Sequence, residues 1–177
     1  MKKRFIELLL GTGIVGIENL IIELENGTFF ESPASSGNHL CKIGGLLEHS
    51  LNVYDVASKL PMAEEVEPND LIIACLLHDA GKMGAFGKAN YVPNILKSTQ
   101  KVSEKKPFKT NNIGLQHQDI SLMIINKHIA LTQEAAIAIK YHNGLYTSDG
   151  RDIKGNETKL MLIVHFADMW ASRAVEV

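Results

Sequence analysis

The chain has 177 residues, of which 45% are hydrophobic, and this is enough apolar material for one domain with its own core. Its net charge of −2 gives no electrostatic basis for binding duplex DNA or an anionic membrane surface. Cys41 and Cys75 fit neither a metal-binding nor a redox spacing, and no segment approaches the roughly 20 apolar residues of a membrane-spanning helix. The composition therefore favours a soluble, cytoplasmic protein.

Apolar residues at three- and four-residue spacing predict helices along most of the chain. In the first half, the expected helices cover residues 3–10, 16–25, 46–60 and 71–79. Pro61 ends the third of these helices, and Gly81 closes the fourth.

In the second half, the expected helices cover residues 113–129, residues 133–142 and a segment that starts after Asn156 or Thr158. Thr132 is expected to cap the second of these, and Gly144 to end it. The expected loops are residues 32–38, 84–112 and 148–156. This pattern predicts an all-α bundle in a single domain, with residues 1–30 as an N-terminal helical segment and residues 31–177 as the main unit.

Six potential metal ligands fall at helical positions where apolar residues would be expected. They are His49, His78, Asp79, His117, His142 and Asp168. A buried carboxylate without a partner costs several kcal/mol, so Asp79 and Asp168 need partners. Each could pair with a lysine or cap a helix, but that explanation must account for six residues separately. One centre with two divalent transition metal ions (Fe, Mn, Zn, Ni or Co), bridged by the two oxygens of Asp79, accounts for all six.

Four segments of the chain follow an order that is typical of one enzyme superfamily. They are Gly45-Leu46-Leu47-Glu48-His49-Ser50, Leu76-Leu77-His78-Asp79-Ala80-Gly81-Lys82, Tyr141-His142-Asn143-Gly144 and His165-Phe166-Ala167-Asp168. Together they resemble the successive motifs of HD-domain metal-dependent phosphohydrolases. The resemblance is closest to the small stand-alone HD hydrolases of bacteria and phages, and to the HD domain of bacterial 3′→5′ exoribonucleases.

The resemblance implies an HD-type helical bundle with a buried two-metal site. One metal would be held by His49, His78, Asp79 and Asp168. A second metal would be held by His117 and His142, with Asp79 as the bridge. Lys82 matches a lysine that reaches a substrate phosphate in many members, and His39 is a weaker candidate for contacting phosphate.

The expected activity is hydrolysis of a phosphoester or phosphoanhydride bond in a nucleotide-type substrate by metal-activated water, with Asp79 and Lys82 as catalytic residues. A 3′→5′ exonuclease acting on short RNA or DNA is one alternative. A nucleotide-binding regulator without turnover is an alternative of a different class. The expected partner is therefore a nucleotide or short oligonucleotide, rather than duplex DNA or a membrane, and assembly into a homo-oligomer stays open.

Five lysines give the predicted loop before His117 a locally basic character. They are Lys97, Lys101, Lys105, Lys106 and Lys109. The segment 97–109 is either a solvated, flexible loop or a lid that draws in a polyanionic substrate. Residues 1–30 can either cover the site or form a dimer contact.

Overall fold

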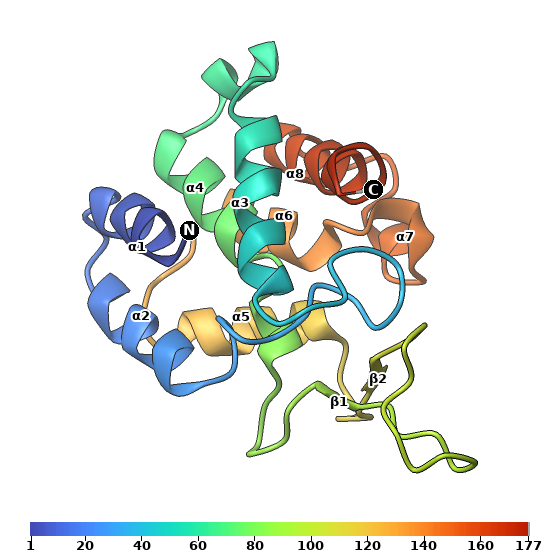
Figure 1. Cartoon of the computed structure of the whole chain (residues 1–177). Coiled ribbons are helices and arrows are strands. Elements are labelled where there is room, and N and C mark those ends of the chain that lie inside the picture. Colours follow the sequence, from blue (N-terminus) through green and yellow to red (C-terminus); the bar gives the residue numbers. More distant parts are fainter. Residues whose placement is uncertain (177) are drawn as a thin grey trace.

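The computed structural model describes residues 1–176, and most of its regular structure is helical. The described α-helices are α1 (Lys2–Gly11), α2 (Ile17–Asn26), α3 (Gly45–Ala57), α4 (Pro68–Leu77), α5 (His117–Asn126), α6 (Gln133–Tyr141), α7 (Gly150–Ile153) and α8 (Lys159–Trp170). Helices α3 and α6 each pack against both α4 and α8, and these four form the central bundle. Figure 1 shows α1 and α2 on one side of this bundle. The predicted all-α, single-domain fold is confirmed.

The N-terminal helices share one hydrophobic core with the bundle. Phe5 on α1 packs against Phe29 and Phe30, which follow α2, with ring centroids 5.1 and 5.7 Å away. These rings belong to the same buried cluster as Leu46 on α3 and Leu76 on α4. Burying each large apolar side chain contributes about 1.5–3 kcal/mol, so this contact fixes the first helices firmly on the bundle. The boundary at residue 30 stays a prediction.

The predicted helix caps agree well with the structure. Thr132 precedes α6, and its Oγ1 accepts a hydrogen bond of 3.1 Å from the backbone N–H of Ala135. Thr158, rather than Asn156, precedes α8, and its Oγ1 accepts from the N–H of Met161 at 3.3 Å. Each cap satisfies one of the N–H groups that the first turn of a helix leaves without an intrahelical partner.

Several predicted helix boundaries differ from the structure. Helix α4 ends at Leu77, so Asp79 lies beyond the helix, and a 3₁₀ turn follows at Ala80–Met83. Helix α5 begins at His117 rather than at residue 113, because Gly114 has a φ of +87° and cannot continue a right-handed helix. In both places the apolar pattern extends past the hydrogen-bonded helix, which explains the error.

Two of the predicted loops contain short regular elements. Strand β1 (Tyr91–Pro93) pairs antiparallel with β2 (Phe108–Thr110) inside the segment 84–112, and α7 lies within the segment 148–156. Strands of three residues are too short to give a periodic signal. The β-hairpin protrudes from the helical body at the lower right of Figure 1.

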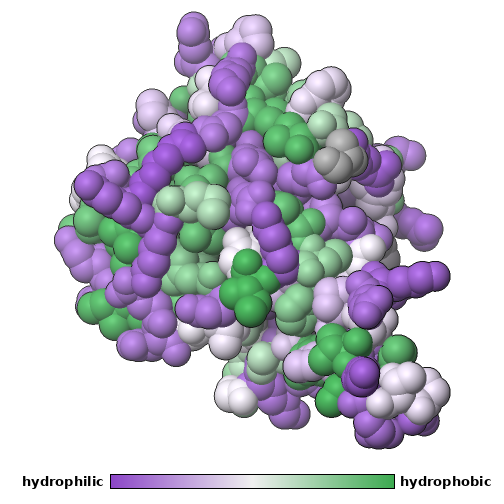
Figure 2. Space-filling model, viewed as in Figure 1, coloured by the Kyte–Doolittle hydropathy of each residue, from purple (hydrophilic) through white to green (hydrophobic). Residues whose placement is uncertain are grey.

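The surface in this view is mixed in character. Figure 2 shows polar side chains over much of the face, with smaller apolar patches between them and on the protruding hairpin. Within residues 1–176, no helix combines the length and the apolar character that crossing a membrane requires.

Candidate metal centre

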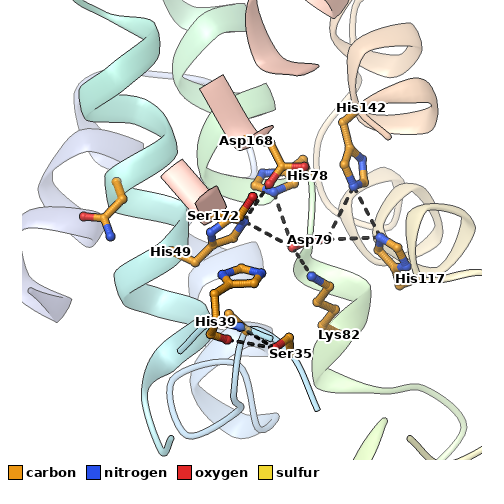
Figure 3. A network of polar contacts seen from close by, with 12 residues as sticks. Ser35, His39, His49, His78, Asp79, Lys82, His117, His142, Asp168 and Ser172 are labelled. Atoms are coloured by element: carbon orange, nitrogen blue, oxygen red, sulfur yellow. Dashed lines mark hydrogen bonds and ion pairs between the residues drawn. The ribbon is translucent and has the colours of Figure 1, made fainter. Parts of the chain in front are cut away.

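The six predicted ligands converge on one buried place although they come from five parts of the chain (Figure 3). His49 lies on α3, His78 and Asp79 follow α4, His117 starts α5, His142 follows α6, and Asp168 lies on α8. The four helices of the bundle therefore each supply or directly precede at least one of these side chains. Their assignment as ligands stays a prediction, while their proximity is a property of the fold.

Asp79 lies at the centre of the cluster, and its two oxygens face different histidines. Its Oδ2 is 3.6 Å from Nε2 of His49 and 3.4 Å from Nε2 of His78. Its Oδ1 is 3.1 Å from Nε2 of His117 and 3.5 Å from Nε2 of His142. Asp168 joins the first side, where its Oδ1 is 3.1 Å from Nε2 of His49. The carboxylate of Asp79 thus divides the cluster into two sets of ligand atoms.

Two of the histidines are oriented by the ends of their own helices. Nδ1 of His78 donates to the carbonyl of Cys75 at 2.9 Å, and Nδ1 of His142 donates to the carbonyl of Ile139 at 2.8 Å. The last turn of a helix leaves such carbonyls free to accept. Because Nδ1 carries the proton in each ring, Nε2 is left with a lone pair that points toward Asp79 and can bind a metal.

Several buried polar atoms of the cluster lack a hydrogen-bond partner within residues 1–176. They are Nε2 of His49, Nε2 of His78 and Oδ1 of Asp79. Leaving a buried donor or acceptor unpaired costs about 1–3 kcal/mol, and native folds avoid this. Divalent cations on the two sides of Asp79 would satisfy these atoms, and groups of three ligand atoms lie within 4.8 Å of one another on both sides. The residues therefore fit a metal, and imidazole with carboxylate suits Fe, Mn, Co, Ni or Zn.

The electrostatics of the cluster also favour a cation. Burial by itself lowers the pKa of His49, but the close contacts of its ring with the carboxylates of Asp168 and Glu176 outweigh burial and raise the pKa to about 9. Without a metal, His49 is therefore protonated, and its positive charge balances the negative charge of these carboxylates. By contrast, burial together with the nearby His78 lowers the pKa of His142 to about 3. His142 is therefore neutral at physiological pH, as a ligand must be.

Lys82 approaches the cluster from the 3₁₀ turn. Its Nζ is 2.5 Å from Oδ2 of Asp79, and the carboxylate raises the pKa of the lysine although burial opposes this. Gly81 makes the arrangement possible, because a Cβ at this position would lie 2.0 Å from the carbonyl oxygen of His117. The glycine allows the start of α5 to approach the turn and brings His117 to Asp79.

A cavity of about 570 Å³ connects the cluster to the surface. Its lining includes Asn38, His39, Lys82, His142, Asn143, Tyr146, Asp168 and Arg173. The guanidinium of Arg173 lies over the Tyr146 ring, 5.2 Å from its centroid. An anionic molecule entering here would meet two cationic side chains, Lys82 and Arg173, next to the candidate ligands.

Two further histidines, His39 and His165, lie beside the candidate ligands. His39 lies beside the cluster, with its ring centroid 4.8 Å from that of His49, and it lines the cavity. Its predicted contact with phosphate remains a prediction. His165 has a structural contact, because its Nδ1 donates to the carbonyl of His142 at 2.7 Å.

Sequence reasoning missed Glu176, whose carboxylate contacts both His39 and His49. It lies outside every motif and near the C-terminal end of the chain, so no local pattern marks it. Tyr146, in the 3₁₀ turn Gly144–Tyr146, was also missed, because an exposed aromatic residue gives no sign of the cavity that it borders.

Comparison with known proteins agrees with this geometry. The family model described as the HD domain matches residues 46–169, which run from α3 to α8 and include all six candidate ligands. Neither the search of curated proteins nor the search of solved structures found a match. Since the family model covers well over half of the chain, this protein belongs to the HD domain family, whose members are generally metal-dependent phosphohydrolases that bind divalent metals.

Proposed function

We propose that the protein hydrolyses a phosphoester or phosphoanhydride bond of a nucleotide-type substrate at a centre of two divalent transition metal ions. The observation that carries this proposal is the position of Asp79, whose two oxygens face different sets of histidines. A carboxylate in this position can bridge two cations. The family membership supports metal-dependent hydrolysis, and the cavity beside the cluster supports an anionic substrate.

The two metals would be held by two overlapping sets of residues. His49, His78, Asp79 and Asp168 would hold one ion, and Asp79, His117 and His142 would hold the other. When bound, the ions would polarise the phosphoryl oxygens and lower the pKa of a water molecule, so that the water can act as the nucleophile at neutral pH.

The side chains of the cavity would bind and orient the substrate. Lys82 and Arg173 provide positive charge for the phosphate, and the Lys82 ammonium offsets negative charge that develops on the phosphoryl oxygens during attack. Tyr146, which is 65% exposed, offers an aromatic face on which a nucleobase can stack. Direct attack by water is the simplest route, because it requires no covalent intermediate on the protein.

A 3′→5′ exonuclease is a second candidate, and the basic hairpin favours it. The segment 97–109 carries exposed lysines, and one of them, Lys106, packs against Gly37. Its Cε would lie 3.3 Å from a Cβ at that position. Gly37 directly precedes Asn38 and His39, which line the cavity. A polyanionic strand could therefore extend from the cavity along the hairpin.

The test is a panel of mono-, di- and triphosphate nucleotides, dinucleotides, and short RNA and DNA, incubated with Mn²⁺. The wild type is compared with Asp79→Ala and with the control Asp152→Ala, which alters an exposed aspartate on α7. We expect hydrolysis by the wild type and the control but not by Asp79→Ala, and mass spectrometry of the products identifies the bond that is cleaved. Tight nucleotide binding without any product would instead indicate a binding regulator.

A further inference from the structure

The last described residue, Glu176, has an inward-facing side chain although it lies near the end of the chain. A π-helical turn (Ala171–Val175) follows α8, and the N–H of Glu176 donates to the carbonyl of Ala171 at 3.0 Å. This wider turn changes the direction in which the next side chain leaves the backbone. The side chain of Glu176 is only 1% exposed and lies behind His49, on the side opposite to Asp79.

The carboxylate of Glu176 contacts three side chains. Its Oε1 accepts from Nδ1 of His49 and from Nδ2 of Asn52, both at 3.0 Å. Its Oε2 contacts Nδ1 of His39 and lies 3.2 Å from Nδ1 of His49. Glu176 therefore joins α3 and the loop before the site to the C-terminal end of the chain.

His49 requires a partner of this kind because of its place in its helix. His78 and His142 follow the last residues of their helices and use free backbone carbonyls, whereas His49 is the fifth residue of the thirteen-residue α3. The neighbouring carbonyls of α3 are engaged in intrahelical hydrogen bonds. A side chain from outside the helix must therefore fix the rotation of the imidazole ring.

We propose that Glu176 is a positioning residue of the metal centre. By accepting a hydrogen bond from Nδ1 of His49, it holds the ring so that Nε2 faces Asp79 and Asp168. By its contact with Nδ1 of His39, it also holds that ring at the cavity, with Nε2 as the ring nitrogen left for a substrate. This inference rests on the proposed metal centre, and it assigns Glu176 a role in forming it.

The test measures metal binding directly and does not depend on knowing the substrate. The affinity for Mn²⁺ or Co²⁺ is measured by competition with a chelator for the wild type, Glu176→Ala and Glu176→Gln. The control is Glu64→Ala, which removes an exposed carboxylate. The visible absorption spectrum of the Co²⁺-loaded proteins reports the arrangement of ligands around the metal, which a general loss of stability would leave unchanged in the folded fraction.

Removing a partner that orients a metal ligand typically weakens metal binding or activity by 10–100-fold. We therefore expect a loss of about this size in Glu176→Ala, with an altered Co²⁺ spectrum, and a smaller loss in Glu176→Gln, which keeps one acceptor oxygen. Circular dichroism verifies folding, and if the alanine variant does not fold, the glutamine variant decides the question.

Two negative results have different meanings. If both Glu176 variants bind metal as the wild type does, with unchanged Co²⁺ spectra, Glu176 does not position His49 and the inference is wrong. If Asp79→Ala also binds metal normally, the proposed centre itself is wrong. Measuring Asp79→Ala in the same series therefore separates failure of the inference from failure of the proposed function.

Discussion

The two halves of the candidate metal centre differ in how completely the protein satisfies their ligand atoms. In the half around His49 and His78, both Nε2 atoms are fully buried and lack a hydrogen-bond partner within residues 1–176. In the other half, the Asn143 amide lies 2.9 Å from Nε2 of His142, and the side chain of His117 is 23% exposed. The first half thus contains two unpaired ring nitrogens, whereas the unpaired atom on the second side is Oδ1 of Asp79, and a protein amide already contacts His142 there.

The two halves also differ in how firmly the protein holds the imidazole rings of their histidines. The rings of His49 and His78 are held through Nδ1 by Glu176 and by the carbonyl of Cys75, respectively. His142 has a comparable anchor in the carbonyl of Ile139, whereas no contact of Nδ1 of His117 is found in the described part of the chain. A preorganised site loses less conformational entropy on binding. We therefore expect the first half to bind its metal more tightly than the second.

The largest effect is expected from the residue that the two halves share. Asp79→Ala removes one ligand from each ion, so both metals should be lost and turnover should fall to background. Asp168→Ala affects only the first half and should leave the second set of ligands in place. Metal analysis by mass spectrometry after dialysis distinguishes the two variants. Retention of two metals by Asp79→Ala would contradict the bridging role of this residue.

A loss of one ion is expected when only the second half is altered. His117→Ala should reduce the metal content from two ions to one per chain, because His142 and Asp79 alone hold the second ion poorly. The control is His128→Ala, which removes a histidine paired with Glu23 outside the cluster. Titration of the metal-free wild type should show two unequal affinities. Equal affinities, or loss of both ions in His117→Ala, would refute the proposed difference between the halves.

Lys82→Ala should leave both metals bound and affect the reaction itself. The lysine contributes positive charge at the cavity, and removing one group that stabilises the transition state typically lowers turnover by about 10²–10³-fold. Metal content and turnover are measured on the same preparation, beside the exposed control Lys88→Ala. A loss of metal in Lys82→Ala would mean that the lysine maintains the cluster rather than serving the substrate.

The smallest effect on the centre is expected from Ser121, which links its two halves. Its Oγ accepts from the N–H of Gly81 and donates to the carbonyl of His78, both at 2.8 Å. Ser121→Ala leaves a buried N–H without an acceptor, which should lower the free energy of unfolding by about 1–3 kcal/mol. Denaturant unfolding measures this loss against the exposed control Ser98→Ala. Metal content should remain at two ions per chain, and a change in it would show that the link also shapes the centre.

Local patterns predicted the helices and the ligand types well. The cap Thr132 was identified correctly and Thr158 was one of two candidates, because a cap depends on residues only three positions apart. The ordered motifs likewise indicated the HD family, which the family model confirms. The C-terminal end of α4 and the start of α5 were wrong, because the apolar pattern extends past Leu77, where α4 ends, and begins before His117, where α5 starts.

The sequence by itself determined the fold class and which side chains have the chemistry to bind a metal, because both follow from residue type and short-range spacing. Tertiary structure alone decided which atoms face one another. Glu176 meets His49 across 127 positions of the chain, and it does so only because a π-helical turn after α8 directs it behind α3. The side of Asp79 on which each histidine lies is likewise set by the packing of α3, α4, α5 and α6 around the aspartate. Such contacts depend on the angles and distances between helices, which no local pattern encodes.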